Sequence, residues 1–92
     1  MTTTLIVLAH PSRLSFTGAW AEASAAACAA AGHEVLWSDL SAHQFEAVEG
    51  PRHFGQPEAG SFDPLKAHEA AVAAGRVPVD MVAEAEKIRQ AD

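Results

Sequence analysis

The sequence lacks the features of a secreted, membrane-spanning or nucleic-acid-binding protein. It has a single cysteine, Cys28, which excludes an internal disulfide and is typical of a reducing compartment. It has no cluster of Lys and Arg, and its formal net charge of -6 argues against nucleic acid and anionic membranes as partners. No apolar stretch approaches the roughly 20 residues that span a bilayer, and the first residues do not resemble a signal peptide. We therefore expect a cytoplasmic protein without membrane insertion.

Bulky apolar side chains are also scarce. The chain has 92 residues, enough for one small domain, and 49% of them are hydrophobic. Much of that fraction is alanine, which contributes little buried area per residue, and a short chain buries a smaller share of its surface than a typical domain. We expect the isolated chain to be unstable, oligomeric or dependent on further residues.

The first third of the sequence predicts a strand followed by a helix. Residues 5–9 form a continuous apolar run with β-branched members, which is typical of a parallel strand covered on both faces. Residues 16–31 are rich in alanine and predict a helix, with Ser15 or a neighbour as its N-cap and Gly32 as its C′ residue. Three- and four-residue spacings predict its inward face: Phe16, Ala19, Trp20, Ala23, Ala27 and Ala30.

The remaining segments extend an α/β pattern. A second strand at 35–37 completes a βαβ unit over residues 1–40. Residues 41–78 hold four of the five prolines and four of the six glycines, and they predict an extended surface segment with a short helical piece at 67–74. A final helix is expected at 79–91, with acidic residues near its start and basic residues near its end.

The segment from His10 to Thr17 joins the first strand to the first helix. Open α/β sheets bind ligands at this point, and a helix N-terminus offers free N–H groups to a phosphate. Ser12, Ser15 and Thr17 would add hydroxyl groups, and Arg13 would add charge. Simple helix capping by a serine is the alternative. Neither a glycine-rich dinucleotide fingerprint nor a P-loop is present, so the remaining interpretation is a flavin-type phosphate loop built from hydroxyls and amides.

Several blocks of sequence resemble, in order, the start of the FAD-dependent NAD(P)H:quinone oxidoreductases. The blocks are residues 4–10 with Ser15-Phe16, 31–35, 38–40, and 80–84 with Lys87 and 91–92. The resemblance implies a flavodoxin-like parallel sheet of order 2-1-3-4-5. Only its first βαβ unit, a long loop segment and the following helix would be present here, as the N-terminal part of a single domain.

The resemblance also implies a cofactor site. In the family, the corresponding residues hold the pyrophosphate and ribityl region of FAD, and FMN is the less favoured cofactor; here they are His10, Ser15, Phe16 and Thr17. The chain departs from the family pattern at two positions. Leu14 stands where a hydroxyl residue is common, and Thr17 stands where Asn is common.

The activity implied by the resemblance is that of an NAD(P)H dehydrogenase (quinone). NAD(P)H would reduce FAD, the flavin would pass hydride to a quinone, and the full-length form would be a homodimer. The chain has no tyrosine and ends before the family's flavin-flanking aromatic strand. We therefore expect no catalytic residue in it, and no activity from it alone. The alternatives are a potassium-efflux ancillary flavoprotein, a truncated non-catalytic binding or regulatory module, and a helical interaction protein.

Other chemistry-bearing residues give weaker signals. The histidines lack metal-ligand spacing, so no metal site is expected and exposed or capping roles are favoured; these are His33, His43, His53 and His68. Cys28 is interpreted as a small buried hydrophobe, and Trp20 and Trp37 as core or subunit-contact residues. Asp39 is interpreted as structural. Asp63 lies where the family reaches across a dimer interface.

Overall fold

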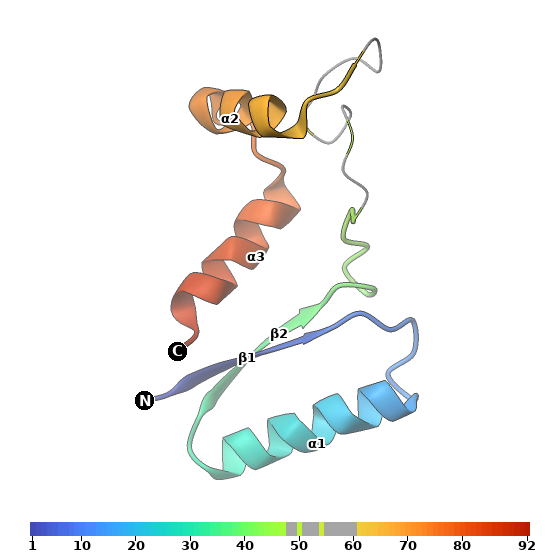
Figure 1. The fold of residues 1–92 in the computed structure, drawn as a ribbon. Coiled ribbons are helices and arrows are strands. Elements are labelled where there is room, and N and C mark those ends of the chain that lie inside the picture. The colour runs from blue at the N-terminus through green and yellow to red at the C-terminus, as the bar shows by residue number, and fades with distance from the viewer. Residues whose placement is uncertain (48–49, 51–53, 55–60) are drawn as a thin grey trace. The chain divides into compact units, whose positions relative to one another are not determined.

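The computed structural model describes residues 1–47, 50, 54 and 61–92, and it contains the elements β1, α1, β2, α2 and α3 in chain order (Figure 1). The chain divides into two compact units. The first comprises Met1–Phe45 and Glu84–Asp92, and the second comprises Glu46–Ala83.

The first unit is built on two parallel strands. Strand β1, Thr3–Leu8, pairs with β2, Glu34–Asp39, in a register that runs from Thr3 opposite Glu34 to Leu8 opposite Asp39. Helix α1 connects the two strands and lies along one face of the pair (Figure 1). The predicted βαβ arrangement is confirmed. The observed ladder also includes polar residues at its ends, because backbone pairing does not depend on an apolar side chain.

Both ends of α1, Phe16–Ala30, are closed by local hydrogen bonds. Ser15 is the N-cap, and its hydroxyl accepts the N–H of Gly18 at 3.1 Å. At the other end, Gly32 N–H donates to Ala29 O at 3.0 Å and His33 N–H donates to Cys28 O at 3.0 Å. This bond pair is a Schellman motif, with Gly32 at φ +86° in its left-handed position. The predicted caps are thus confirmed.

The predicted inward face of α1 is wrong. The residues buried in this helix are Gly18 and Ala21, whereas Phe16 is 82% exposed and Trp20 is 67% exposed. The helix turns its small residues inward, so its backbone approaches the strands closely. Its two large aromatic side chains remain outside, and Trp20 is not a core residue of the described unit.

The second half of α3, Val79–Gln90, is fixed to β2 by polar contacts. Ser38 is almost fully buried, and its hydroxyl donates to the carboxylate of Glu84. The ammonium group of Lys87 donates to the carbonyl of Trp37 at 2.8 Å and to Glu84 at 3.0 Å. These contacts satisfy a buried hydroxyl and join segments that lie far apart in the sequence.

Beyond α3, Asp92 is bonded to the first strand. Its N–H donates to Thr3 O at 2.9 Å, and Thr3 N–H donates to its carboxylate at 2.6 Å. On the β2 side, it is Thr2 O that accepts the N–H of Glu34. Because successive residues of a strand direct their backbone groups to opposite edges, Asp92 lies at the edge of β1 away from β2.

The second unit contains α2, Pro64–Ala74, within the segment that was expected to be extended. The helix begins earlier than the predicted piece, because Asp63 caps it by accepting N–H groups of Leu65 and Lys66, and proline is favourable at the first helical position. It ends at Gly75 with φ +68°. A small cluster forms the core of this unit: Phe54, Ala67 and Ala71, packed with Phe62 and Val77.

Candidate functional site

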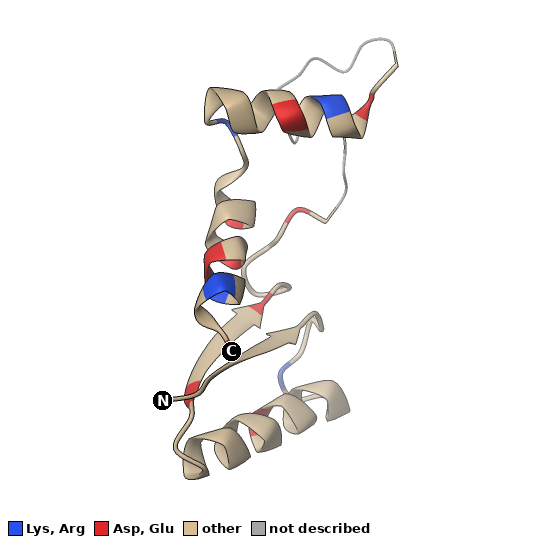
Figure 2. Ribbon diagram, turned by 60° about the vertical axis from the view of Figure 1, so that its left-hand side comes forward, with Lys and Arg blue, Asp and Glu red and all other residues tan. Residues whose placement is uncertain are grey.

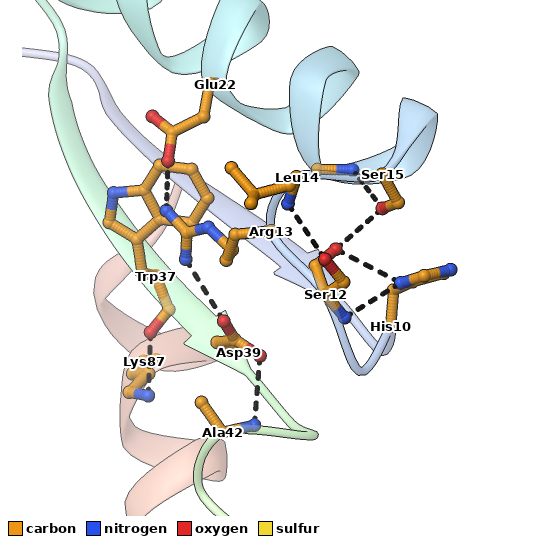
Figure 3. A network of polar contacts seen from close by, with 11 residues as sticks. His10, Ser12, Arg13, Leu14, Ser15, Glu22, Trp37, Asp39, Ala42 and Lys87 are labelled. Carbon is orange, nitrogen blue, oxygen red and sulfur yellow. Dashed lines mark hydrogen bonds and ion pairs between the residues drawn. The ribbon is translucent and has the colours of Figure 1, made fainter.

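The segment between β1 and α1 is folded by hydrogen bonds among its own residues (Figure 3). Ser12 N–H donates to Nδ1 of His10 at 3.0 Å, and Leu14 N–H donates to the Ser12 hydroxyl at 3.1 Å. The Ser15 hydroxyl donates to Ser12 O at 2.6 Å while it accepts the N–H of Gly18. The serines therefore cap and shape the loop, and both hydrogen-bonding directions of the Ser15 hydroxyl are already in use.

Two backbone N–H groups remain available at the start of α1. The amides of Phe16 and Thr17 have no acceptor within the part of the chain that the structure describes. They lie at the positive end of the helix dipole, and the loop that leads to them begins at the C-terminal end of a parallel strand. Unpaired amides at this place fit an anionic phosphate group.

His10 contributes an imidazole ring to the same loop. Its Nδ1 lies 3.0 Å from Ser12 N and 3.1 Å from Ser12 O, so it accepts the N–H of Ser12 in one tautomer and donates to the Ser12 carbonyl in the other. Both contacts use Nδ1 and leave Nε2 outside the hydrogen bonds of the loop. In the tautomer that accepts from Ser12, the proton is on Nε2, which can donate to a ligand.

The guanidinium of Arg13 contacts three protein groups, and 40% of the side chain remains exposed. Its Nη1 donates to Asp39 at 3.1 Å, its Nη2 pairs with Glu22, and its Cζ lies 4.3 Å from the ring centroid of Trp37 (Figure 3). Hydrogen bonds to Glu22 and Asp39 raise the pKa of Arg13. The pKa of Asp39 is lowered, first by the N–H of Ala42 and then by Arg13. The charge that the sequence suggested for phosphate is therefore neutralised within the protein.

No second Lys or Arg lies in this segment of the chain. Arg13 is the only Lys or Arg in residues 1–47, and in Figure 2 the loop before α1 is coloured blue whereas β1, α1 and β2 are not. The loop also has two acidic neighbours, Glu22 and Asp39, bonded to Arg13. A phosphate in this loop would be held by amides and polar side chains and not by a basic pocket.

A cavity of about 290 Å³ opens beside the loop. It is lined by Ile6, Val7 and Leu8 of β1 and by Thr17, Trp20, Ala21 and Ser24 of α1. The rings of Phe16 and Trp20 lie near one another, with centroids 6.3 Å apart. An apolar hollow next to unpaired amides offers both kinds of surface that a cofactor with a phosphate group requires.

The other residues considered from the sequence do not form a second site. His33 is bonded to the Thr4 hydroxyl at 3.0 Å, and Cys28 is half-buried and unpaired by disulfide. Asp63 is the N-cap of α2. His53 lies outside the described residues. Within residues 1–47, 50, 54 and 61–92, no group of three or more potential metal ligands is found.

Sequence comparison assigns the fold family. The family model described as a flavodoxin-like fold matches residues 2–92, so this chain belongs to that family. The parallel βαβ unit agrees with the assignment, and the predicted fold class is confirmed.

Two individual proteins make the similarity more specific. The chain is 38% identical over 90 residues to NAD(P)H dehydrogenase [quinone] 1 of Rattus norvegicus, an alignment that covers 96% of this chain and 33% of the rat protein. It also matches a crystal structure of a Klebsiella pneumoniae protein proposed to be a quinone reductase, with a TM-score of 0.86 and 35% identity over 100% of this chain and 36% of that one. The chain thus spans about a third of the length of each.

No helix among the described residues is long and apolar enough to cross a membrane.

Proposed function

We propose that this chain supplies the flavin-phosphate loop of an FAD-dependent NAD(P)H:quinone oxidoreductase. The observation that carries the proposal is the pair of unpaired amides, Phe16 and Thr17, where β1 leads into α1. Two proteins of similar sequence and fold are named as quinone-linked reductases, which supports the same activity here. The proposal rests on site geometry and family membership together, since the strand–loop–helix arrangement alone is common to many functions.

Four residues would hold the cofactor, each in a different way. Phe16 and Thr17 donate their backbone N–H groups to a phosphate, and His10 donates from Nε2. Ser15 acts mainly by shaping the loop, because its hydroxyl is bonded to Ser12 and Gly18. Leu14, which is 97% exposed, contributes no polar group from its side chain.

FAD is the proposed flavin, with NAD(P)H as co-substrate and a quinone as acceptor, in a cytoplasmic homodimer. The flavin would accept two electrons as hydride from NAD(P)H and pass them to the quinone. Within this chain, the described residues bind and orient the phosphate end. None is assigned a role at the reacting atoms, and we propose that the chain is inactive alone.

A substitution that separates helix capping from phosphate binding tests the proposal. Aspartate can accept the N–H of Gly18 as serine does, so Ser15→Asp should keep the helix cap. It cannot donate to Ser12 O, which should cost about 0.5–1.5 kcal/mol of stability, and its charge should repel a phosphate. The experiment uses the protein encoded by the natural gene, from which any bound flavin is first removed. This protein is then titrated with FAD, FMN and riboflavin, and binding is measured by flavin fluorescence.

The three ligands give distinct outcomes. We expect the wild type to bind FAD more tightly than FMN and riboflavin, and Ser15→Asp to lose most of the preference for phosphorylated flavins. Equal binding of FAD by wild type and S15D would show that the loop does not bind phosphate. A wild type that binds no flavin would refute the proposed function. Tighter binding of FMN than FAD would overturn only the choice of cofactor.

A further inference from the structure

We propose that Arg13 is a positioning residue of the flavin-phosphate loop, whose guanidinium holds the loop against β2 and α1 and makes no contact with the phosphate itself. This inference rests on the proposed function, and it adds a residue to which the sequence resemblance assigns no role. Arg13 lies inside the loop, three residues before the first unpaired amide at Phe16.

The side chain of Arg13 connects the loop to two separate elements. Asp39 ends β2, Glu22 belongs to α1, and the ring of Trp37 in β2 lies against the guanidinium (Figure 3). Asp39 is itself fixed, since its side chain is only 10% exposed and it accepts the N–H of Ala42 at 3.1 Å. A planar guanidinium suits this arrangement because it can bond two carboxylates and stack on an indole at once.

The backbone of Arg13 is held just as closely. A Cβ atom on Gly18 would lie 2.1 Å from Arg13 O and 2.7 Å from Arg13 Cα, so only glycine permits this approach. Arg13 is therefore fixed through its main chain against α1 and through its side chain against β2. The amides of Phe16 and Thr17 lie between these two fixed residues in the chain.

Charge favours positioning over direct phosphate contact. One guanidinium serves two carboxylates, so this cluster carries a net negative charge before any ligand arrives. If Arg13 turned to a phosphate, the largely buried carboxylate of Asp39 would lose its cationic partner, and an unpaired buried charge is costly. The arginine accordingly stays with its protein partners.

The substitution Asp39→Asn distinguishes the two roles by the sign of its effect. Asparagine retains an oxygen for the N–H of Ala42 but removes the charge that holds Arg13. If Arg13 acted directly on phosphate, D39N would release it and tighten FAD binding. If Arg13 positions the loop, D39N should weaken FAD binding by about 10-fold to 100-fold, by analogy with the loss found when the partner that orients a metal ligand is removed.

Further variants define the same role independently. Arg13→Ala should weaken FAD binding to a similar degree, and the double variant with D39N should be no weaker than R13A alone, because both disrupt one contact. Arg13→Lys should also weaken FAD binding, since an ammonium group cannot bond two carboxylates and stack on an indole as the planar guanidinium does. Arg89→Ala, which removes an exposed arginine paired with Glu86, is the control and should leave affinity unchanged.

Hydrogen exchange on the flavin-free protein provides a readout independent of cofactor binding. Exchange at residues 12–18 should accelerate in R13A, R13K and D39N but not in R89A. Tighter FAD binding by D39N, full affinity in R13K, or unchanged loop exchange would each overturn the assignment of Arg13. If the wild type binds no flavin, the proposed function fails, and faster loop exchange in the variants would still support Arg13 as the residue that positions this loop.

Discussion

The carbonyl oxygen of Arg13 lies 2.1 Å from the place where a Cβ atom of residue 18 would stand. No side chain can occupy that space unless the backbone moves. Glycine is a weak helix former, so its presence in the first turn of α1 has a steric reason.

Replacing Gly18 by alanine should therefore destabilise the protein, although alanine favours helices by about 1 kcal/mol relative to glycine. We expect overpacking of about 1–3 kcal/mol to dominate, because Arg13 and the helix must separate. Urea denaturation of the variant should show a lower midpoint. Gly50→Ala, where a Cβ would meet nothing within 4 Å, is the matched control. An unchanged or higher midpoint in G18A would contradict the close approach.

Phe16 offers a test that separates binding from folding. Its side chain is 82% exposed, so Phe16→Ala should change stability by about 0.5 kcal/mol or less. Phe16→Ala keeps the backbone N–H that is proposed to bind phosphate, so FAD affinity should fall only through loss of the ring, whose centroid lies 6.3 Å from that of Trp20 at the cavity. Leu14→Ala removes a comparable apolar side chain that is 97% exposed and has no assigned contact, and it should change neither property. Equal affinities in F16A and wild type would remove the side chain of Phe16 from the site.

Acid should weaken the attachment of α3 to β2. The Ser38 hydroxyl and, to a lesser extent, Lys87 hold the pKa of Glu84 below its ordinary value of 4.5. A carboxyl with a lowered folded-state pKa stabilises the fold above its unfolded value, and this contribution is lost as the pH falls through the lowered value. Stability should thus decline below about pH 4.5.

The variant Glu84→Gln should be less stable than wild type near neutral pH, and the difference should shrink as the pH falls below 4.5 and the wild-type carboxyl becomes protonated. Chemical denaturation at several pH values measures this. Glu69→Gln makes the same charge change on α2, where the described residues provide no ion-pair partner, and should not show the effect. A constant difference between E84Q and wild type across that range would exclude the linkage.

Gly32 should be sensitive to substitution for backbone reasons alone. Its φ of +86° lies in the left-handed region, and a Cβ there would meet nothing within 4 Å. Gly32→Ala should cost about 1–2 kcal/mol, and Gly32→Asn should cost less because asparagine tolerates this conformation better. Thermal or urea unfolding of the two variants gives the comparison. Equal stability of G32A and wild type would show that the Schellman motif is not needed.

Local sequence patterns were sufficient to predict most elements of the first unit. The apolar run at 5–9 identified β1, and Ser15 and Gly32 marked the limits of α1, because caps depend on residues close in the chain. The inward face of α1 could not be found in the same way. A search for an apolar stripe favours large side chains such as Trp20, whereas close packing of a helix on strands selects small ones.

The contacts of Arg13 could not be predicted from its neighbours in the sequence. Its partner Asp39 is 26 residues away. Asp39 reaches the loop because the parallel register places it opposite Leu8, just before the loop begins. The sequence indicated a basic residue near a phosphate, but it contained no signal that this charge would be neutralised.

The bond from Lys87 to the carbonyl of Trp37 has a consequence for the nascent chain. These residues are separated by 50 positions, which a ribosome adding about 5–20 residues per second covers in roughly 3–10 s. The described core residues of the second unit, from Phe54 to Val77, are synthesised within that interval. Synthesis of the first unit therefore begins before that of the second unit and ends after it. Strand β2 lacks its contacts with α3 until the intervening segment has been made.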